Sequence, residues 1–195
     1  KGVYAPVHVS GNQFLITSTE TDTVVKEGVS PYRNRLYATT LSNGTFQNTE
    51  VLNIEGTETA INQGAATINP ANGSVYFTQW KNVNGQIISS LYYATKTGKG
   101  LSTPVLLGSV NSNGYSSKQP YCTSDGKYLF FASDRPGGAG KFDIWYAPIN
   151  ADGTTGDAVN AGSIINTPAD ELAPFYHNTS STLVFSANGR MGMGG

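Results

Sequence analysis

The sequence is poor in charged residues, in long apolar runs and in cysteine, and each scarcity excludes a class of protein or of binding partner. Only 13% of its 195 residues are charged, against about 25% in typical soluble domains, and the net charge is −1. Nucleic acids and anionic membranes attract clustered lysines and arginines, so neither is expected as the main partner. No apolar run approaches the ~18 residues of a membrane-spanning helix. The single cysteine, Cys122, excludes an internal disulfide framework and a multi-cysteine zinc site.

Glycine and tyrosine, by contrast, are abundant, with 23 and 11 residues. Threonine, serine and asparagine are also frequent, whereas good helix formers rarely follow one another. Glycine and asparagine favour tight turns, and aromatic and β-branched residues favour strands. The composition therefore predicts short strands joined by turns.

Two motifs recur along the chain at a common interval. The first combines an Ala/Pro opening, a polar turn and an apolar strand, and it occupies residues 5–18, 65–78, 119–133 and 173–186. The second is a Leu or Ile followed by aromatic residues and alanine, and it occupies residues 35–39, 90–94 and 143–147. Each motif advances by 53 to 60 residues per step. Two motifs that keep the same interval indicate a structural repeat.

Each repeat reads as four short strands. The segments 71–74 and 124–127 have the Asn/Asp-Gly chemistry of tight hairpins, which need positive φ. Four antiparallel strands in a repeat of about 50 residues are typical of a β-propeller blade. A β-sandwich would not repeat its sequence in this way, and the coils of a β-helix are much shorter. Helix is nowhere the better prediction.

The fold class predicted is all-β, a propeller fragment of about three and a half four-stranded blades. The expected blades span residues 4–62, 63–117 and 118–171, with an incomplete fourth at 172–195. Because propellers typically close with roughly 4 to 8 blades, we expect this piece to belong to a ring of six to eight. The natural protein is expected to continue beyond residue 195 and to begin before residue 1, with any targeting segment upstream.

Residues 120–135, which read P-Y-C-T-S-D-G-K-Y-L-F-F-A-S-D-R, carry a family resemblance. They resemble the TolB-type, WD40-like propeller repeat, P-x-x-S-P-D-G-K-x-L-x-F-x-S-D-R. Together with segments 136–145 and 173–195, they resemble the propeller of OmpA-family envelope proteins of Bacteroidetes, including components linked to type IX secretion. The first two repeats lack the Ser-Asp-Arg element, so the match is looser over residues 1–118.

The resemblance implies a non-catalytic scaffold in the periplasm, associated with the outer membrane, whose partners are other envelope proteins. Peptidoglycan would be contacted through an OmpA-like domain outside this chain, and no cofactor is implied. Two alternatives stay open: an accessory propeller of a hydrolase or peptidase, and a carbohydrate-binding propeller that uses exposed aromatic residues. The sequence downstream of residue 195 would separate the first alternative from the scaffold.

Two loops are the candidate contact surfaces, because loops on a rigid scaffold commonly carry binding. One is the long loop 20–34 of the first repeat, with Pro31, Tyr32 and Arg33. The other begins with Asp134 and Arg135. A purely structural role for this second pair is the stronger prediction, with Asp134 accepting backbone N–H groups and Arg135 pairing with a carboxylate.

The sequence predicts no catalytic, cofactor-binding or metal-binding residues. Segment 150–157 has the oxygen-rich look of a Ca²⁺ loop, but it occupies a slot that is a hairpin turn in other repeats. His8 and His177 lack metal-ligand spacing, and no Gly-x-Ser-x-Gly elbow occurs. Cys122 is expected to be a buried, inert thiol.

The strand aromatics are expected to pack between blades rather than to form a sugar-stacking platform. This expectation covers Trp80, Tyr92, Tyr93, Phe130, Phe131, Trp145 and Tyr146.

Overall fold

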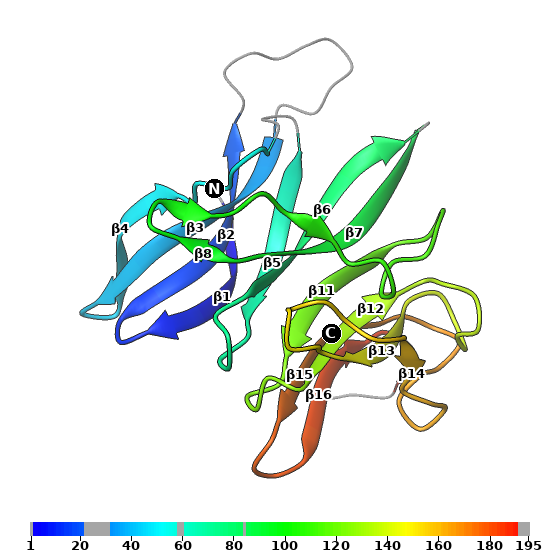
Figure 1. The fold of residues 1–195 in the computed structure, drawn as a ribbon. Coiled ribbons are helices and arrows are strands. Elements are labelled where there is room, and N and C mark those ends of the chain that lie inside the picture. Colours follow the sequence, from blue (N-terminus) through cyan, green and yellow to red (C-terminus); the bar gives the residue numbers. More distant parts are fainter. Residues whose placement is uncertain (1, 22–31, 58–60, 84, 191–195) are drawn as a thin grey trace.

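The computed structural model describes residues 2–21, 32–57, 61–83 and 85–190 (Figure 1). Within these ranges all regular secondary structure is β, in sixteen strands. No helix in the described ranges is long and apolar enough to cross a membrane. The predicted all-β class is therefore confirmed.

The first sheet, blade 1, is a four-stranded antiparallel meander in the order β1-β2-β3-β4. Its strands are β1 (Val3–Ser10), β2 (Gln13–Thr21), β3 (Tyr32–Ser42) and β4 (Thr45–Val51). Asn43 and Gly44 join β3 to β4 with φ values of 49° and 76°. Positive φ at both central residues is the signature of a type I′ hairpin, for which Asn-Gly is the preferred pair.

The second sheet, blade 2, repeats the same meander in the order β10-β7-β6-β5. Its strands are β5 (Asn62–Ile68), β6 (Val75–Val83), β7 (Gln86–Ala94) and β10 (Val105–Leu106). The chain between β7 and β10 forms a small separate hairpin of β8 (Lys96–Thr97) and β9 (Gly100–Leu101).

The third sheet, blade 3, has the order β11-β12-β13-β14, and two further strands begin the next unit. These strands are β11 (Ser117–Cys122), β12 (Tyr128–Ser133), β13 (Asp143–Pro148), β14 (Val159–Asn160), β15 (Glu171–His177) and β16 (Thr182–Ala187). The second sequence motif falls in β3, β7 and β13, the third strand of each complete sheet. We call β15 and β16 half-blade 4.

The turns after β5 and β11 are wider than the tight hairpins predicted for them. Only Gly73 and Gly126 have positive φ there, at 74° and 72°. Asn72 and Asp125 instead accept the backbone N–H two residues later, at 2.9 and 3.1 Å. The Asx side chain thus replaces the second left-handed residue, because it supplies the turn's hydrogen bond itself.

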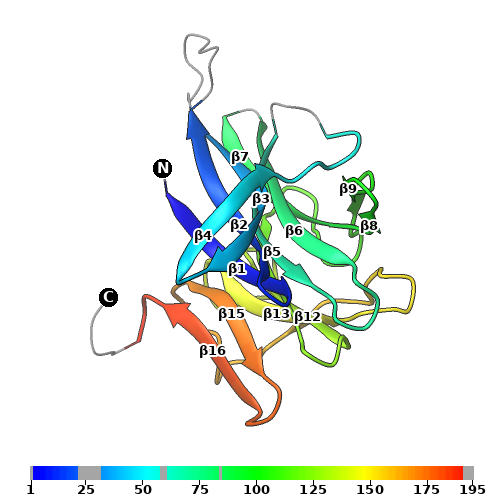
Figure 2. The same cartoon turned by 90° about the vertical axis from the view of Figure 1, so that its left-hand side faces the viewer.

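The sheets face one another around their first strands, so that β1 lies against β5, β5 against β11, and β11 against β15 (Figures 1 and 2). Apolar side chains fill the interfaces. Between blades 1 and 2 these include Leu15, Leu36, Val75 and Phe77. Between blades 2 and 3 they include Tyr76, Leu91, Leu129, Phe131 and Trp145. Packing between equivalent sheets in this way is propeller architecture.

Each first strand carries a β-bulge at the same place in its repeat. The pairing register slips there, and one non-glycine residue has positive φ. These residues are Ala5, Ala65, Gln119 and Ala173, with φ of 49°, 41°, 55° and 51°. Because such values are uncommon outside glycine, their recurrence in four repeats identifies a built feature of the fold.

Candidate functional site

The bulged parts of the four first strands line a cavity of about 400 Å³. We call this surface the inner wall. It is formed by segments 4–8, 65–67, 119–121 and 173–175. A proline follows the bulge residue in three of the four strands, and apolar side chains such as Phe175, 45% exposed, stand on the wall.

Side chains of neighbouring strands take up the N–H groups of the bulge residues. Ala65 donates to Thr17 Oγ1 at 3.1 Å, and Gln119 donates to Thr78 Oγ1 at 3.0 Å. Ala173 donates to Gln119 Oε1 at 3.0 Å. These bonds join successive blades and satisfy the backbone donors. The N–H groups of these three bulge residues are therefore not available to a molecule on the inner wall.

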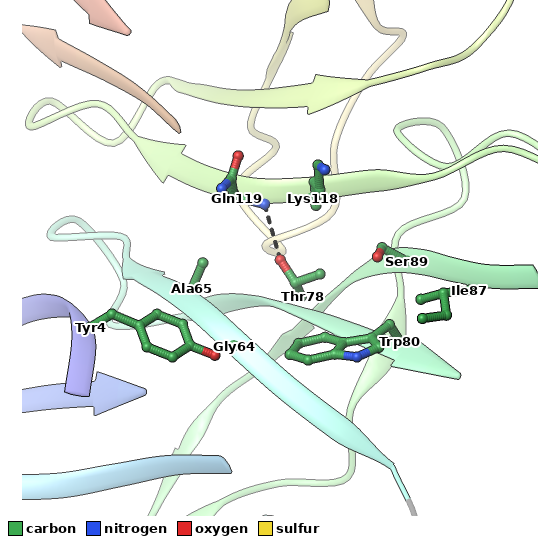
Figure 3. A pocket seen from close by; sticks show the side chains of 9 residues that line it. All are labelled: Tyr4, Gly64, Ala65, Thr78, Trp80, Ile87, Ser89, Lys118 and Gln119. Carbon is green, nitrogen blue, oxygen red and sulfur yellow. Dashed lines mark hydrogen bonds between the residues drawn. The ribbon is translucent and has the colours of Figure 1, made fainter. Parts of the chain in front are cut away.

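A second cavity of about 220 Å³ adjoins the inner wall and is lined by residues of blades 2 and 3 together with Tyr4 of blade 1 (Figure 3). We call it the Tyr4–Trp80 pocket, and its lining residues are Tyr4, Gly64, Ala65, Thr78, Trp80, Ile87, Ser89, Lys118 and Gln119. Figure 3 shows the rings of Tyr4 and Trp80 on either side of Gly64, with β11 passing over them.

Gly64 is what allows the indole of Trp80 to lie against strand β5. A Cβ at this position would stand 3.1 Å from Trp80 Cζ3 and 3.3 Å from Thr17 Cγ2. Both distances are tighter than ordinary van der Waals contact, so any side chain there would push the indole away. The glycine thus places one ring of the pocket.

The charged group of Lys118, which lines the pocket, contacts an aromatic ring that is not part of the pocket lining. Lys118 Nζ lies 3.6 Å from the centroid of the Phe142 ring, a cation–π contact, and burial lowers the pKa of this ammonium. No carboxylate lines the pocket among the described residues. The Tyr4 hydroxyl donates to Asn34 Oδ1 at 2.7 Å, and burial raises its pKa. Apart from Lys118, the pocket therefore presents neutral aromatic, aliphatic, hydroxyl and amide groups.

Of the three candidate residues in the first contact loop, the structure describes two, Tyr32 and Arg33. Pro31 lies outside the described residues. Tyr32 is 60% exposed at the start of β3, and Arg33 is half-buried beside it. Neither lines the inner wall or the pocket. Their role in partner binding stays a prediction.

The second candidate pair is tied into blade 3. Asp134 Oδ1 accepts the Ser116 N–H at 2.6 Å, as predicted for a backbone-capping carboxylate. Arg135 does not pair with a carboxylate in the described part of the chain, which corrects the prediction. Its guanidinium donates to Ser117 Oγ at 3.0 Å and to the Val110 carbonyl.

Arg190 repeats this arrangement in half-blade 4. It donates to the carbonyls of Ile164 and Ile165 at 2.7 Å, and its guanidinium lies 5.5 Å from the ring of Phe185. Arg135 lies 5.1 Å from the ring of Phe131 in the same way. In both units an arginine thus ties the connector before the first strand to an aromatic residue of the second strand.

The glycine-rich loop after Arg135 wraps a buried carboxylate. Asp143 Oδ2 accepts the N–H groups of Ala139 and Gly140, at 3.0 and 3.3 Å. A Cβ at Gly138 would collide with this carboxylate. Asp143 Oδ1 is buried without a hydrogen-bond partner in the described structure, and burial raises the pKa of the group. The glycine-rich loop thus encloses an acid.

Two asparagines with a backbone-pairing role were not recognised from the sequence. Asn111 both accepts from the Leu91 N–H and donates to its carbonyl, each at 2.9 Å. Asn166 does the same with Ile144, at 2.8 and 2.9 Å. The 55-residue spacing of the two asparagines is the signal that could have revealed them.

The strand aromatics divide into two groups. Phe131 and Trp145 lie in the core between blades, and Phe130 stacks on Tyr176 of half-blade 4 with ring centroids 5.5 Å apart, as predicted. The prediction of interblade packing misses Trp80, which lines the pocket. Tyr4 was not singled out at all, because its position in the sequence carries no motif.

The remaining polar candidates serve hairpins. In segment 150–157, Asp152 Oδ1 accepts from the N–H and the hydroxyl of Thr154, at 3.0 and 2.6 Å, which describes a hydrogen-bonded turn. His8 Nε2 contacts the Gly11 carbonyl at 2.9 Å. The described ranges contain no group of three or more metal-ligating acids, histidines or cysteines.

Cys122 is buried in β11, as expected. Burial raises the pKa of its thiol to about 12. A thiol with such a pKa is almost entirely protonated at neutral pH, so it is a poor nucleophile.

Several solved structures have a fold similar to that of this chain. The chain is similar to TolB from Acinetobacter baumannii, with a TM-score of 0.56 and 18% identity over 97% of this chain and 39% of that one. It is also similar to puromycin hydrolase, with a TM-score of 0.56, 10% identity and coverage of 95% and 36%. A mutant of a puromycin hydrolase complexed with PGG matches with a TM-score of 0.53, 10% identity and the same coverage.

No family model matches the sequence, and no curated protein does. At these identities the likeness concerns the fold alone, and it agrees with the propeller architecture described above. The chain spans less than half the length of each of these structures.

Proposed function

We propose that this chain is a non-catalytic propeller segment that holds another protein on its inner wall. The observation that carries the proposal is the convergence of four bulged strands on one cavity of about 400 Å³. Proline fixes φ and donates no N–H, so the three prolines that follow bulge residues stiffen the wall. A stiff, partly apolar concave surface suits a protein partner, because little ordering is needed on binding.

The compartment we propose is the periplasm, with other cell-envelope proteins as partners. The likeness to TolB and the TolB-type repeat of residues 120–135 support this assignment. The closer resemblance to OmpA-family propellers of Bacteroidetes suggests peptidoglycan association through a domain other than this one, and a link to type IX secretion.

Site-specific crosslinking in the native host tests the proposal. A photoreactive residue replaces Phe175 on the inner wall or, as the matched control, Ile164, which is 85% exposed and lines neither cavity. We expect a discrete envelope-protein adduct at position 175 and none at 164. The purified partner should then bind the wild-type chain and lose affinity for Phe175→Ser. Equal crosslinking at the two positions, or undiminished binding to Phe175→Ser, contradicts the proposal.

A second candidate function is an accessory role beside a catalytic domain. The structural likeness to puromycin hydrolase favours it. This candidate requires a hydrolase domain in the same polypeptide. Sequencing the gene product around this segment decides between a nucleophile elbow and a peptidoglycan-binding domain.

A further inference from the structure

We infer that the Tyr4–Trp80 pocket is a binding site for a neutral sugar residue, whose ring packs on the indole of Trp80. This inference concerns a different cavity from the protein site proposed above, and it does not depend on that proposal. It rests on the rings that bound the pocket, on the polar groups left free there, and on the backbone groups already used.

The first observation is the pair of aromatic rings. The indole of Trp80 is held against β5 by the absence of a side chain at Gly64, and Tyr4, 41% exposed, stands on the other side of that glycine (Figure 3). Ile87 completes an apolar border. The flat apolar face of a sugar ring is matched by such a surface, because an aromatic ring buries area without needing a hydrogen bond from that face.

The second observation is the set of polar groups beside the rings. Thr78 Oγ1 accepts the Gln119 N–H, and its own hydroxyl hydrogen is left to donate. Within the described part of the chain, the Ser89 backbone N–H donates to Ser116 Oγ at 3.2 Å, and neither Ser89 Oγ nor Trp80 Nε1 makes a hydrogen bond. All three groups are neutral, and hydroxyls both donate and accept. They fit a ligand that carries hydroxyl groups around an apolar ring.

The third observation separates a sugar from a peptide. Extended peptides are commonly recognised through backbone hydrogen bonds of a strand. At this pocket the amides of the two bulge residues, Ala65 and Gln119, are already bonded to threonine hydroxyls. A volume of about 220 Å³ also suits one ring rather than a strand. These two amides are therefore not available to pair with a peptide strand.

An acidic ligand is not favoured. The nearest cation, Lys118, holds its ammonium 3.6 Å from the centroid of the Phe142 ring. In Figure 3 its side chain rises from β11 on the side away from the two rings of the pocket. A carboxylate in the pocket would therefore lack a charged partner, and its desolvation would oppose binding.

Tryptophan fluorescence provides the test, because the chain has only two tryptophans and Trp145 is buried. The probes are methyl β-glucoside and N-acetylglucosamine, with glucuronate as the acidic analogue and sorbitol as the open-chain control. We expect a saturable change in tryptophan fluorescence when a neutral sugar is added. The dissociation constant should be about 1 mM, which corresponds to a binding free energy of about −4 kcal/mol. Sorbitol and glucuronate should bind at least about tenfold more weakly.

Three variants make the assignment specific, with binding measured by calorimetry and folding checked by circular dichroism. Trp80→Leu should abolish sugar binding, and Ser89→Ala should weaken it severalfold. Phe46→Leu, which removes an exposed ring on the outer strand β4, should leave it unchanged. Crosslinking at position 175 should be unaffected by Trp80→Leu.

Several results would overturn the inference. One is the absence of saturable binding of either sugar up to about 50 mM, well above the expected constant. Equal binding by sorbitol, or equal sugar affinity in a folded Trp80→Leu chain, would do the same. So would displacement of the sugar by an apolar peptide that binds more tightly, because the pocket would then be a peptide site.

Discussion

The hydroxyl of Thr17, a fully buried residue of blade 1, accepts the backbone N–H of Ala65 in blade 2 at 3.1 Å. Ala65 is the left-handed residue of its β-bulge, so its N–H points away from the sheet and would otherwise lack a partner. The same relation recurs one blade later between Thr78 and Gln119. A threonine on the second strand of one blade thus anchors the bulge of the next.

Thr17→Val tests this relation, because valine keeps the shape and removes the acceptor. The Ala65 N–H is then left unpaired in a part-buried site, and we expect a loss of about 1–3 kcal/mol in the free energy of unfolding. Urea denaturation measures it. Thr179→Val, at an exposed turn position, is the control and should change stability little. An unaltered midpoint in Thr17→Val would show that the bond is dispensable.

Arg135→Gln separates a structural from a binding role for the second candidate loop. The substitution removes the donors to the Val110 carbonyl and Ser117 hydroxyl and the contact with the Phe131 ring. We expect a loss of about 2 kcal/mol or more in the free energy of unfolding. Lys141→Gln, at an exposed position of the same loop, is the matched control. Unchanged stability together with lost partner crosslinking would instead make Arg135 a contact residue.

Asp143 should make stability depend on pH. Burial, with the like charge of Glu171 as a lesser cause, raises its folded pKa from the ordinary aspartate value. The folded chain therefore holds this proton more tightly than the unfolded chain. The resulting stability is present at low pH and is lost as the pH rises through the raised pKa.

Asp143→Asn has no proton to lose at this position, and its amide oxygen can still accept from Ala139 and Gly140. We therefore expect its free energy of unfolding to increase relative to wild type as the pH rises from about 4 to 7. Urea titrations of both chains across this range give the difference. Parallel pH profiles would contradict a raised pKa at Asp143.

Cys122 should resist thiol reagents in the folded chain. Its thiol is buried and has a pKa of about 12, so at pH 8 little thiolate is present and access is blocked. Labelling with a chromogenic disulfide should be slow in native buffer and rapid after unfolding in urea, where the thiol returns to its ordinary pKa. Fast stoichiometric labelling of the native chain would place the thiol at the surface.

Repetition is what made the fold predictable. The Leu/Ile-aromatic-Ala strands at 35–39, 90–94 and 143–147 alternate between two packed faces, so their pattern is visible without any tertiary information. The β3–β4 turn at Asn43 and Gly44 was equally local, since its φ values depend only on the two residues in it. The wider turns at Asn72 and Asp125 could not be predicted in this way. There the side chain accepts a backbone N–H, and this bond takes the place of a second residue with positive φ.

The amino-acid sequence determined the strands, their grouping in fours and the equivalence of successive units, because these follow from short-range periodicity and turn chemistry. Only the tertiary structure decided which residues line the inner wall and the Tyr4–Trp80 pocket. Ala65 and Gln119 have no sequence signal for left-handed backbone, and Tyr4, Gly64 and Trp80 come together from three strands. Their proximity depends on how far each blade rotates against the last. That rotation is set by packing across the interfaces rather than by any single residue.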